Sequence, residues 1–120
     1  MKAVRWVGSA RDDLRTFPDD VQATFGFALY QVQNGKHPAN AKPLRGFGSG
    51  VLELLDDFDG DTYRAIYTVR FQSAVYVLHA FEKKSPHGIK LARRDSNLIR
   101  ARLARATSME AAQRDEEGKR

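Results

Sequence analysis

The sequence contains no cysteine in its 120 residues, which excludes disulfide bonds, thiolate nucleophiles and thiolate-ligated zinc or iron–sulfur centres. Only three histidines are present, His37, His79 and His87, and they are scattered, so we expect neither a metal site nor another cofactor. No run approaches the roughly 20 consecutive apolar residues of a membrane span, so we expect no membrane partner. The first residues also lack the apolar run of a signal peptide, and we therefore expect a cytoplasmic protein.

The composition is that of one folded domain. Hydrophobic residues make up 42% and charged residues 29% of the chain, and seven Phe, four Tyr and one Trp supply bulk for a core. The length is close to that of a typical single domain. Lysine and arginine together number 20 against 15 acids, and this net charge of +5 points to an anionic partner.

The positive charge is concentrated in two stretches. Residues 36–50 hold three bases and no acid, whereas residues 51–63 hold five acids and no base. Residues 83–105 then hold eight bases against one acid. A basic segment this dense attracts phosphate groups if it faces a ligand, and is otherwise a solvated helix face. The choice between these readings depends on whether the fold brings the two basic stretches together.

The first third of the chain predicts a strand followed by two helices. Residues 2–7 are rich in β-branched and aromatic residues and too few for a helix, which indicates a strand. A short helix is expected over residues 9–17, and Pro18 suits the start of a second helix that ends at Asn34-Gly35. The apolar stripe of this second helix consists of Val21, Phe25, Leu29 and Val32. We interpret Gly26 as a point of close packing, because glycine otherwise weakens a helix.

The remainder predicts a loop, three strands and a last helix. Residues 37–50 contain two prolines and three glycines, which is typical of a loop. Asp59-Gly60 is a strong signal for a hairpin turn. The predicted strands cover residues 51–56, 62–71 and 74–82, and the predicted helix covers residues 95–106.

Apolar residues alternate on both faces of the third of these strands. Val75, Val77, His79 and Phe81 point one way by the alternation, and Tyr76, Leu78 and Ala80 point the other way. A strand that is apolar on both faces is expected in the middle of a sheet that is covered on both sides.

The elements follow the order β-α-α-β-β-β-α, and we predict an α+β domain of residues 1–106 with a mostly antiparallel sheet. The N-terminal helical hairpin then packs on one face of the sheet. The opposite face forms a shallow cleft, bounded by the 36–50 loop and the basic C-terminal segment. We expect residues 107–120 to be a polar, flexible tail, in which residues 109–113 could extend the last helix.

Two segments look like ligand-binding loops but lack essential features. The glycine-rich run at residues 46–50 precedes a strand and not a helix, so we interpret it as a turn and not as a phosphate-binding loop. Residues 56–61 hold four aspartates around Gly60, but no glutamate stands at the twelfth position and strands flank the segment. We interpret it as a hairpin tip, with contact to a partner protein as the alternative.

Arg64 is the most informative single residue, because it lies mid-strand beside residues that the alternation predicts to be buried. It either pairs with an acid such as Glu53 on the neighbouring strand or lines a cleft that binds phosphate. We interpret His79 as a hydrogen-bonded core histidine. His87 stands in a Pro-Gly loop beside two lysines, and is the better candidate for proton transfer.

The order and spacing of four runs are similar to those of a known family. The runs are Ala41-Lys42-Pro43-Leu44-Arg45-Gly46, Val51-Leu52-Glu53-Leu54, Tyr63-Arg64-Ala65-Ile66-Tyr67 and Val77-Leu78-His79-Ala80-Phe81-Glu82-Lys83-Lys84-Ser85. Over residues 2–105 the sequence resembles the RelE/ParE superfamily of toxins from type II toxin–antitoxin systems. In particular, it is similar to the HigB-like branch, which includes phage-derived members. The predicted order of elements agrees with the small fold of that superfamily.

The resemblance implies a ribosome-dependent mRNA interferase, an endoribonuclease that needs no metal. In such toxins the 2′-OH of the RNA attacks the adjacent phosphate in the ribosomal A site, and cationic side chains stabilise the developing charge. By position, the catalytic residues would be Arg64, Lys84 and His87, with Arg64 the main phosphate-stabilising group. The residues that bind RNA would be Lys42, Arg45, Lys83 and Lys90.

The resemblance also implies the partners. They are the ribosome with its mRNA, and a cognate antitoxin that is a helix-turn-helix protein. The toxin would contact operator DNA only through this antitoxin. Many members carry a Tyr near the C-terminus as an acid–base or stacking group, whereas residues 86–90 of this sequence contain none. His87 or Lys90 would have to replace that Tyr, so the identity of the general base stays open.

Three alternatives to the interferase remain open from the sequence. The first is a ParE-like inhibitor of DNA gyrase, against which the basic cluster argues. The second is a basic module that binds RNA or DNA without catalysis, and its affinity would fall steeply with salt. The third is a degenerate toxin that only binds its antitoxin.

Overall fold

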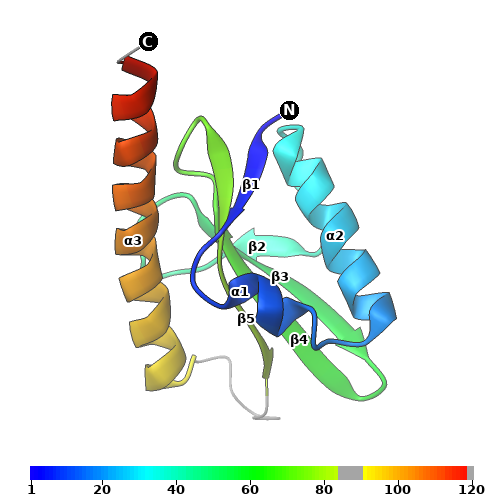
Figure 1. The fold of residues 1–120 in the computed structure, drawn as a ribbon. Coiled ribbons are helices and arrows are strands. Elements are labelled where there is room, and N and C mark those ends of the chain that lie inside the picture. Colours follow the sequence, from blue (N-terminus) through cyan, green and yellow to red (C-terminus); the bar gives the residue numbers. More distant parts are fainter. Residues whose placement is uncertain (84–90, 119–120) are drawn as a thin grey trace.

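The computed structural model describes residues 1–83 and 91–118 (Figure 1). One sheet is formed by β1 (Ala3–Trp6), β2 (Ala41–Pro43), β3 (Val51–Phe58), β4 (Asp61–Thr68) and β5 (Ala74–Lys83). The strand order is β1-β5-β4-β3-β2, with β1 parallel to β5 and the other neighbours antiparallel. The helices are α1 (Ala10–Leu14), α2 (Asp19–Gln33) and α3 (Arg93–Gly118).

Helices cover both faces of the sheet, and the predicted α+β fold with a helical hairpin on one face is confirmed. α1 and α2 pack on one face, and α3 runs along the other (Figure 1). The core on the α2 side includes Phe25, Leu54 and Tyr67, and the core on the α3 side includes Ile66 and Ile99. All five side chains are almost completely buried, as expected for a sheet with a helix layer on each face.

β5 is the central, doubly covered strand that the alternation predicted, but a bulge changes which residues share a face. In β4, the successive residues Ile66 and Tyr67 pair with His79 and Val77 of β5. Leu78 is therefore an extra residue in β5. An extra residue shifts the alternation beyond it by one position. His79 and Phe81 therefore face α3, so the predicted placement of these two side chains with Val77 is wrong.

β4 ends at Thr68, before the predicted end at residue 71. The Thr68 hydroxyl donates to the carbonyl of Gly50 at 2.6 Å and accepts from the backbone N–H of Arg70 at 3.1 Å. The Arg70 guanidinium in turn donates to the carbonyls of Phe47 and Ser49, both at 2.9 Å. These bonds take the chain out of the sheet and hold the glycine-rich turn around Arg70.

The segment predicted as a loop contains the short strand β2. This strand pairs antiparallel with β3 and places Lys42 opposite Glu53. Pro43 is compatible with this strand because β2 lies at the edge of the sheet. A proline there, which lacks an N–H, need not remove a hydrogen bond between strands. The hairpin between β3 and β4 has the predicted turn, with φ values of 52° at Asp59 and 85° at Gly60.

α3 continues to Gly118, well beyond the predicted helix end at residue 106. Glu110 lies in this second half and is only 4% exposed. Its carboxylate accepts hydrogen bonds from the hydroxyls of Ser73 and Tyr76, the latter at 3.0 Å. Burial and the bond to Glu110 raise the pKa of Tyr76 to about 12. These contacts hold the second half of α3 against the start of β5, and no local pattern in the sequence predicts them.

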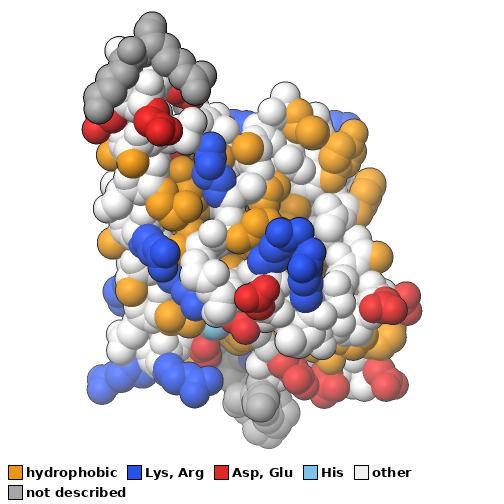
Figure 2. Space-filling view, in the orientation of Figure 1, with side chains coloured by type: hydrophobic (Ala, Val, Ile, Leu, Met, Phe, Trp, Pro, Cys, Tyr) orange, Lys and Arg blue, Asp and Glu red, His pale blue; other side chains and the backbone are white. Residues whose placement is uncertain are grey.

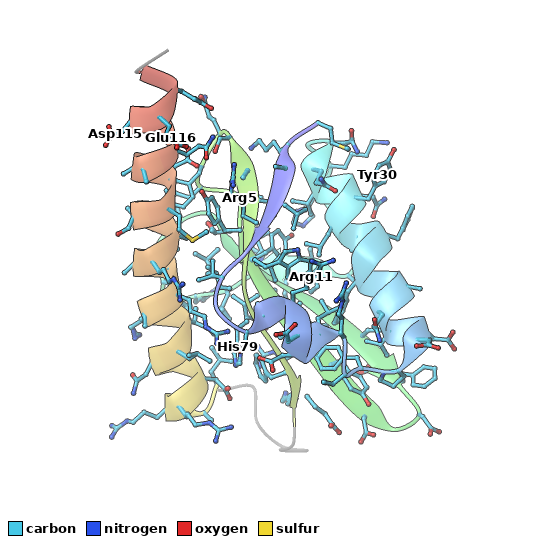
Figure 3. All side chains as sticks on the ribbon, in the orientation of Figure 1. Arg5, Arg11, Tyr30, His79, Asp115 and Glu116 are labelled. Carbon is cyan, nitrogen blue, oxygen red and sulfur yellow. The ribbon has the colours of Figure 1, made fainter. Side chains whose placement is uncertain are left out.

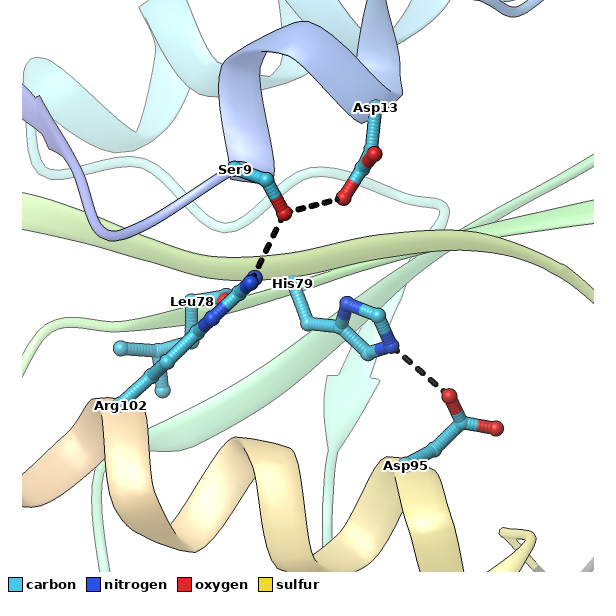
Figure 4. A network of polar contacts seen from close by, with 6 residues as sticks. All are labelled: Ser9, Asp13, Leu78, His79, Asp95 and Arg102. Carbon is cyan, nitrogen blue, oxygen red and sulfur yellow. Dashed lines mark hydrogen bonds and ion pairs between the residues drawn. The ribbon is translucent and has the colours of Figure 1, made fainter.

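A polar network connects α3 to β5 and to the start of α1 (Figure 4). Arg102 donates to the carbonyl of Leu78 at 3.0 Å and to the hydroxyl of Ser9 at 2.8 Å. Ser9 donates in turn to the carboxylate of Asp13 at 2.7 Å. Arg102 therefore serves the fold, although it belongs to the basic stretch of residues 83–105.

Along the lower edge of the face in Figure 2, side chains of the two signs of charge gather in different places. Figure 2 shows Lys and Arg side chains at the lower left, over the first turns of α3. Acidic side chains gather at the lower right, over the β3–β4 turn and the start of α2. Within residues 1–83 and 91–118, no helix combines the length and the apolar composition that a membrane span requires.

Candidate functional site

A cleft of about 740 Å³ opens between the segment around β2 and the first half of α3. The segment around β2 contributes Lys42, Pro43, Leu44, Arg45 and Phe47. The strands β3 and β4 contribute Glu53 and Arg64, and the C-terminal segment contributes Leu91, Ser96 and Arg100. This is the cleft predicted between the 36–50 loop and the basic C-terminal segment, and the two basic stretches meet in it.

Among the described residues, four cations and one carboxylate line the cleft. Lys42, Arg45 and Arg100 are exposed, whereas Arg64 and Glu53 are buried. Cations gathered around one hollow attract phosphate more strongly than the same charges spread over a surface, because their fields add. Arginine and lysine are also the side chains that bind phosphate oxygens directly. The arrangement therefore suits a ligand that carries phosphate groups.

Arg64 pairs with Glu53 and also lines the cleft, so the two placements considered from the sequence occur together. Its Nε donates to Oε2 of Glu53 at 2.8 Å, and its Nη2 bonds the same oxygen. The two side chains are 5% and 4% exposed, so the ion pair is largely removed from water. Arg64 also lines the cleft, and its Cζ lies 5.4 Å from the centroid of the Phe81 ring. The guanidinium is thus oriented by Glu53 and Phe81 without any ligand.

A second layer of contacts supports Phe81. His79 stacks on its ring, with 4.6 Å between the ring centroids. Nε2 of His79 lies 2.8 Å from Oδ1 of Asp95, between the sheet and the start of α3 (Figures 3 and 4). Burial lowers the pKa of His79 below its ordinary value, although the Asp95 carboxylate acts in the opposite direction. His79 is therefore the buried, hydrogen-bonded histidine that the sequence predicted.

Glu53 lines the cleft, whereas the sequence indicated it only as a partner for Arg64. Its second oxygen, Oε1, lies 3.4 Å from Nζ of Lys42, whose side chain is 57% exposed. One carboxylate thus holds a buried arginine and an exposed lysine at the same cleft. The available signal was a single acid between Leu52 and Leu54, because an acid in a buried apolar strand needs a partner.

The structure places only some of the predicted site residues. Lys42, Arg45 and Arg64 meet in the cleft. Lys83 ends β5 opposite Thr62 of β4, and is not among the described residues that line the cleft. Lys84, His87 and Lys90 lie outside the described residues.

Phe47 and Arg100 line the cleft without having been predicted there. The Arg100 guanidinium lies over the Phe47 ring, with Cζ 5.0 Å from the ring centroid. The two residues are far apart in the sequence, one in the glycine-rich turn and one on α3. No local pattern could have indicated that they meet.

Fold and site together define a small α+β domain with a cation-lined cleft suited to phosphate. The model of the phage-derived protein Gp49-like family matches residues 12–104. The chain therefore belongs to the phage-derived Gp49-like family and is a toxin of the RelE/ParE superfamily, as the four sequence runs predicted.

A chain of the solved toxin–antitoxin complex RelBE2 from Mycobacterium tuberculosis is 25% identical to this chain, with a TM-score of 0.48. The match covers 68% of this chain and 98% of that chain. A search of the curated proteins found no match.

Proposed function

We propose that this toxin is an endoribonuclease that cuts mRNA in the ribosomal A site. The observation that carries the proposal is the meeting of Lys42, Arg45, Arg64 and Arg100 around one carboxylate in a single cleft. Its partners are the ribosome, mRNA and a helix-turn-helix antitoxin that mediates contact with operator DNA, and it acts in the cytoplasm. The resemblance of the sequence to the superfamily supports this choice of reaction and partners.

In the proposed reaction the RNA supplies its own nucleophile, so no metal or cofactor is required. The 2′ oxygen forms a bond to the adjacent phosphorus while the bond from phosphorus to the 5′ oxygen of the next nucleotide breaks. The products are a 2′,3′-cyclic phosphate and a 5′-OH. The 2′-OH gives up a proton and the leaving 5′ oxygen takes one up. Negative charge develops on the nonbridging phosphate oxygens, where fixed cations stabilise it.

Arg64 is the group best suited to stabilise that charge. Because Glu53 and Phe81 already orient its guanidinium, little reorganisation accompanies the reaction. Removal of one such fixed donor typically lowers the rate of an enzyme by about 10²- to 10³-fold. In this proposal Glu53 and Phe81 are positioning residues.

The proposal also assigns roles to exposed residues of the cleft and to residues that follow β5. Lys42 and Arg45 contact the RNA backbone from the open side of the cleft. By resemblance, Lys84 supplies a second catalytic cation, and His87 transfers the proton, with Lys90 as the alternative base. Lys83 and Lys90 contribute to RNA binding. The parts played by Lys84, His87 and Lys90 rest on the sequence.

Induced expression in cells, followed by 5′-end mapping of mRNA, tests the proposal. We expect cuts within reading frames that disappear when translation is blocked. Arg45→Ala should reduce cutting about tenfold, because a charged contact to phosphate is lost while an exposed side chain contributes little to the fold. Arg15→Ala removes an exposed arginine that lines a hollow beside α1 and α2, and should cut like the wild type. Arg64→Lys retains the charge but not the two-pronged geometry, and should lose most activity.

The other outcomes identify the alternatives. Growth arrest with intact mRNA would favour gyrase or another target. Neither arrest nor cuts, from a folded protein, would leave a non-catalytic binding module or a toxin that only binds its antitoxin. Wild-type cutting by Arg64→Lys would exclude Arg64 as the main catalytic residue. In a ribosome assay with purified components, a 2′-deoxy sugar at the cut site should abolish cleavage, and continued cleavage would refute the proposed nucleophile.

A further inference from the structure

Part of the cleft lining is aromatic and apolar, and phosphate binding leaves this part unexplained. Leu44, Phe47 and Leu91 line it together with Arg100. The guanidinium of Arg100 lies over the Phe47 ring, with Cζ 5.0 Å from the ring centroid. An arginine that only had to attract phosphate would not need an aromatic ring beneath it.

Phe47 is held firmly in place. Its ring belongs to the core on the α3 side and is 9% exposed, and its carbonyl accepts a hydrogen bond from Arg70 at 2.9 Å. Arg100, by contrast, is exposed and lines the cleft. The Phe47 ring therefore supports the Arg100 guanidinium, and Arg100 stays exposed where the described residues line the cleft.

We propose that Arg100 and Phe47 form a binding position for an unpaired nucleobase. The base stacks on the Arg100 guanidinium while the adjoining phosphate meets the cations around Arg64. The inference rests on the proposed function, because that function makes RNA the ligand. Unpaired RNA bases are commonly recognised by stacking on aromatic rings and guanidinium planes.

The charges of the cleft favour RNA over an acidic peptide at this position. The only carboxylate among the described cleft residues is Glu53, and Arg64 and Lys42 neutralise it. Phosphate therefore meets no uncompensated negative charge among them. A base and its phosphate are joined by a short covalent link, which matches a cleft lined by the planar cation of Arg100 and by further cations.

Binding of short RNA to the purified full-length protein tests the position. One probe is an RNA trinucleotide with 2-aminopurine in the middle and a 2′-deoxy sugar at the scissile position. The matched probe has the same phosphates but an abasic middle position. We expect the wild type to bind the 2-aminopurine probe about tenfold more tightly than the abasic probe, with fluorescence quenched by stacking.

Three variants test which side chains cause the preference for the probe that carries the base. Arg100→Lys retains the charge but removes the plane, and Phe47→Leu retains the apolar filling but removes the ring. Both should lose the preference for the base while retaining the salt-dependent binding that the phosphates provide. Arg105→Lys makes the same exchange at an exposed position of α3 outside the cleft, and should bind like the wild type.

Equal binding of the two probes by the wild type, or an unchanged preference in Arg100→Lys, would overturn the inference. This readout is independent of the mapping of mRNA cuts. A protein that cuts mRNA but ignores the base would overturn the stacking position alone. A protein that prefers the base but cuts no mRNA would overturn the endoribonuclease and leave the stacking position in place.

Discussion

Glu53 takes part in two ion pairs of very different burial, and this difference predicts how stability responds to substitution. The pair with Arg64 has side chains that are 5% and 4% exposed. The pair with Lys42 joins the same carboxylate to a side chain that is 57% exposed. Loss of Glu53 leaves the Arg64 charge buried without its carboxylate, whereas loss of Lys42 leaves Glu53 still paired.

The expected magnitudes follow from burial. Removing one partner of a buried pair costs about 3–5 kcal/mol, because the remaining charge stays out of water. Glu53→Ala should therefore lower the melting temperature by roughly 12–20 °C, at about 4 °C per kcal/mol for a domain of this size. Lys42→Ala should cost less than about 1 kcal/mol, the usual range for an exposed pair.

A double variant separates the charges from the packing. Arg64→Met combined with Glu53→Leu removes both charges at similar volume, and should regain most of the stability lost in Glu53→Ala. The endoribonuclease activity proposed above should not return, because Arg64, the proposed phosphate-stabilising group, is absent. Urea denaturation followed by circular dichroism measures each free energy of unfolding. Equal losses in Glu53→Ala and Lys42→Ala, or a double variant less stable than Glu53→Ala, would refute this reasoning.

Three further predictions concern the fold. Gly8→Ala should lower the free energy of unfolding by about 1–3 kcal/mol in urea denaturation, because φ at Gly8 is +58° and an added Cβ would lie 2.9 Å from Nε of Arg102. Gly26→Ala should raise it by about 0.5–1 kcal/mol, because nothing lies within 4 Å of a Cβ at Gly26 and the close packing expected there is wrong. For His79 the folded-state pKa is lowered, so the unfolded chain takes up the proton first as the pH falls, and stability is lost from about pH 6.5 downward. His79→Gln should flatten the dependence of stability on pH between about pH 7 and 5, and an unchanged slope would contradict a buried neutral histidine.

Regular patterns in the sequence predicted the elements of the fold well. The apolar stripe of α2 is buried as expected, because a period near four residues is visible locally. Tyr63, Ala65 and Tyr67 share the α2 side of the sheet, as the alternation along β4 predicted. The resemblance to the toxin superfamily also depended on such local order and spacing, and the family comparison confirmed it.

The pattern failed where the deciding contact comes from elsewhere in the chain. The bulge at Leu78 reversed the faces of His79 and Phe81, and thereby placed Phe81 beside Arg64. The alternation of side chains along β5 does not indicate this extra residue, because both faces of the strand are apolar. The length of α3 likewise depends on the burial of Glu110 against β5, in a segment whose composition alone reads as a polar tail.

The sequence by itself determined the class of fold, the superfamily and the presence of two basic stretches, because periodicity, motif order and charge are properties of neighbouring residues. Only the tertiary structure decided which of those charges form the cleft. Arg100 and Arg102 stand two residues apart on α3, yet Arg100 lines the cleft beside Phe47 while Arg102 bonds the backbone of Leu78. Residues two apart on a helix point in different directions, so their surroundings depend on how the helix packs against the sheet.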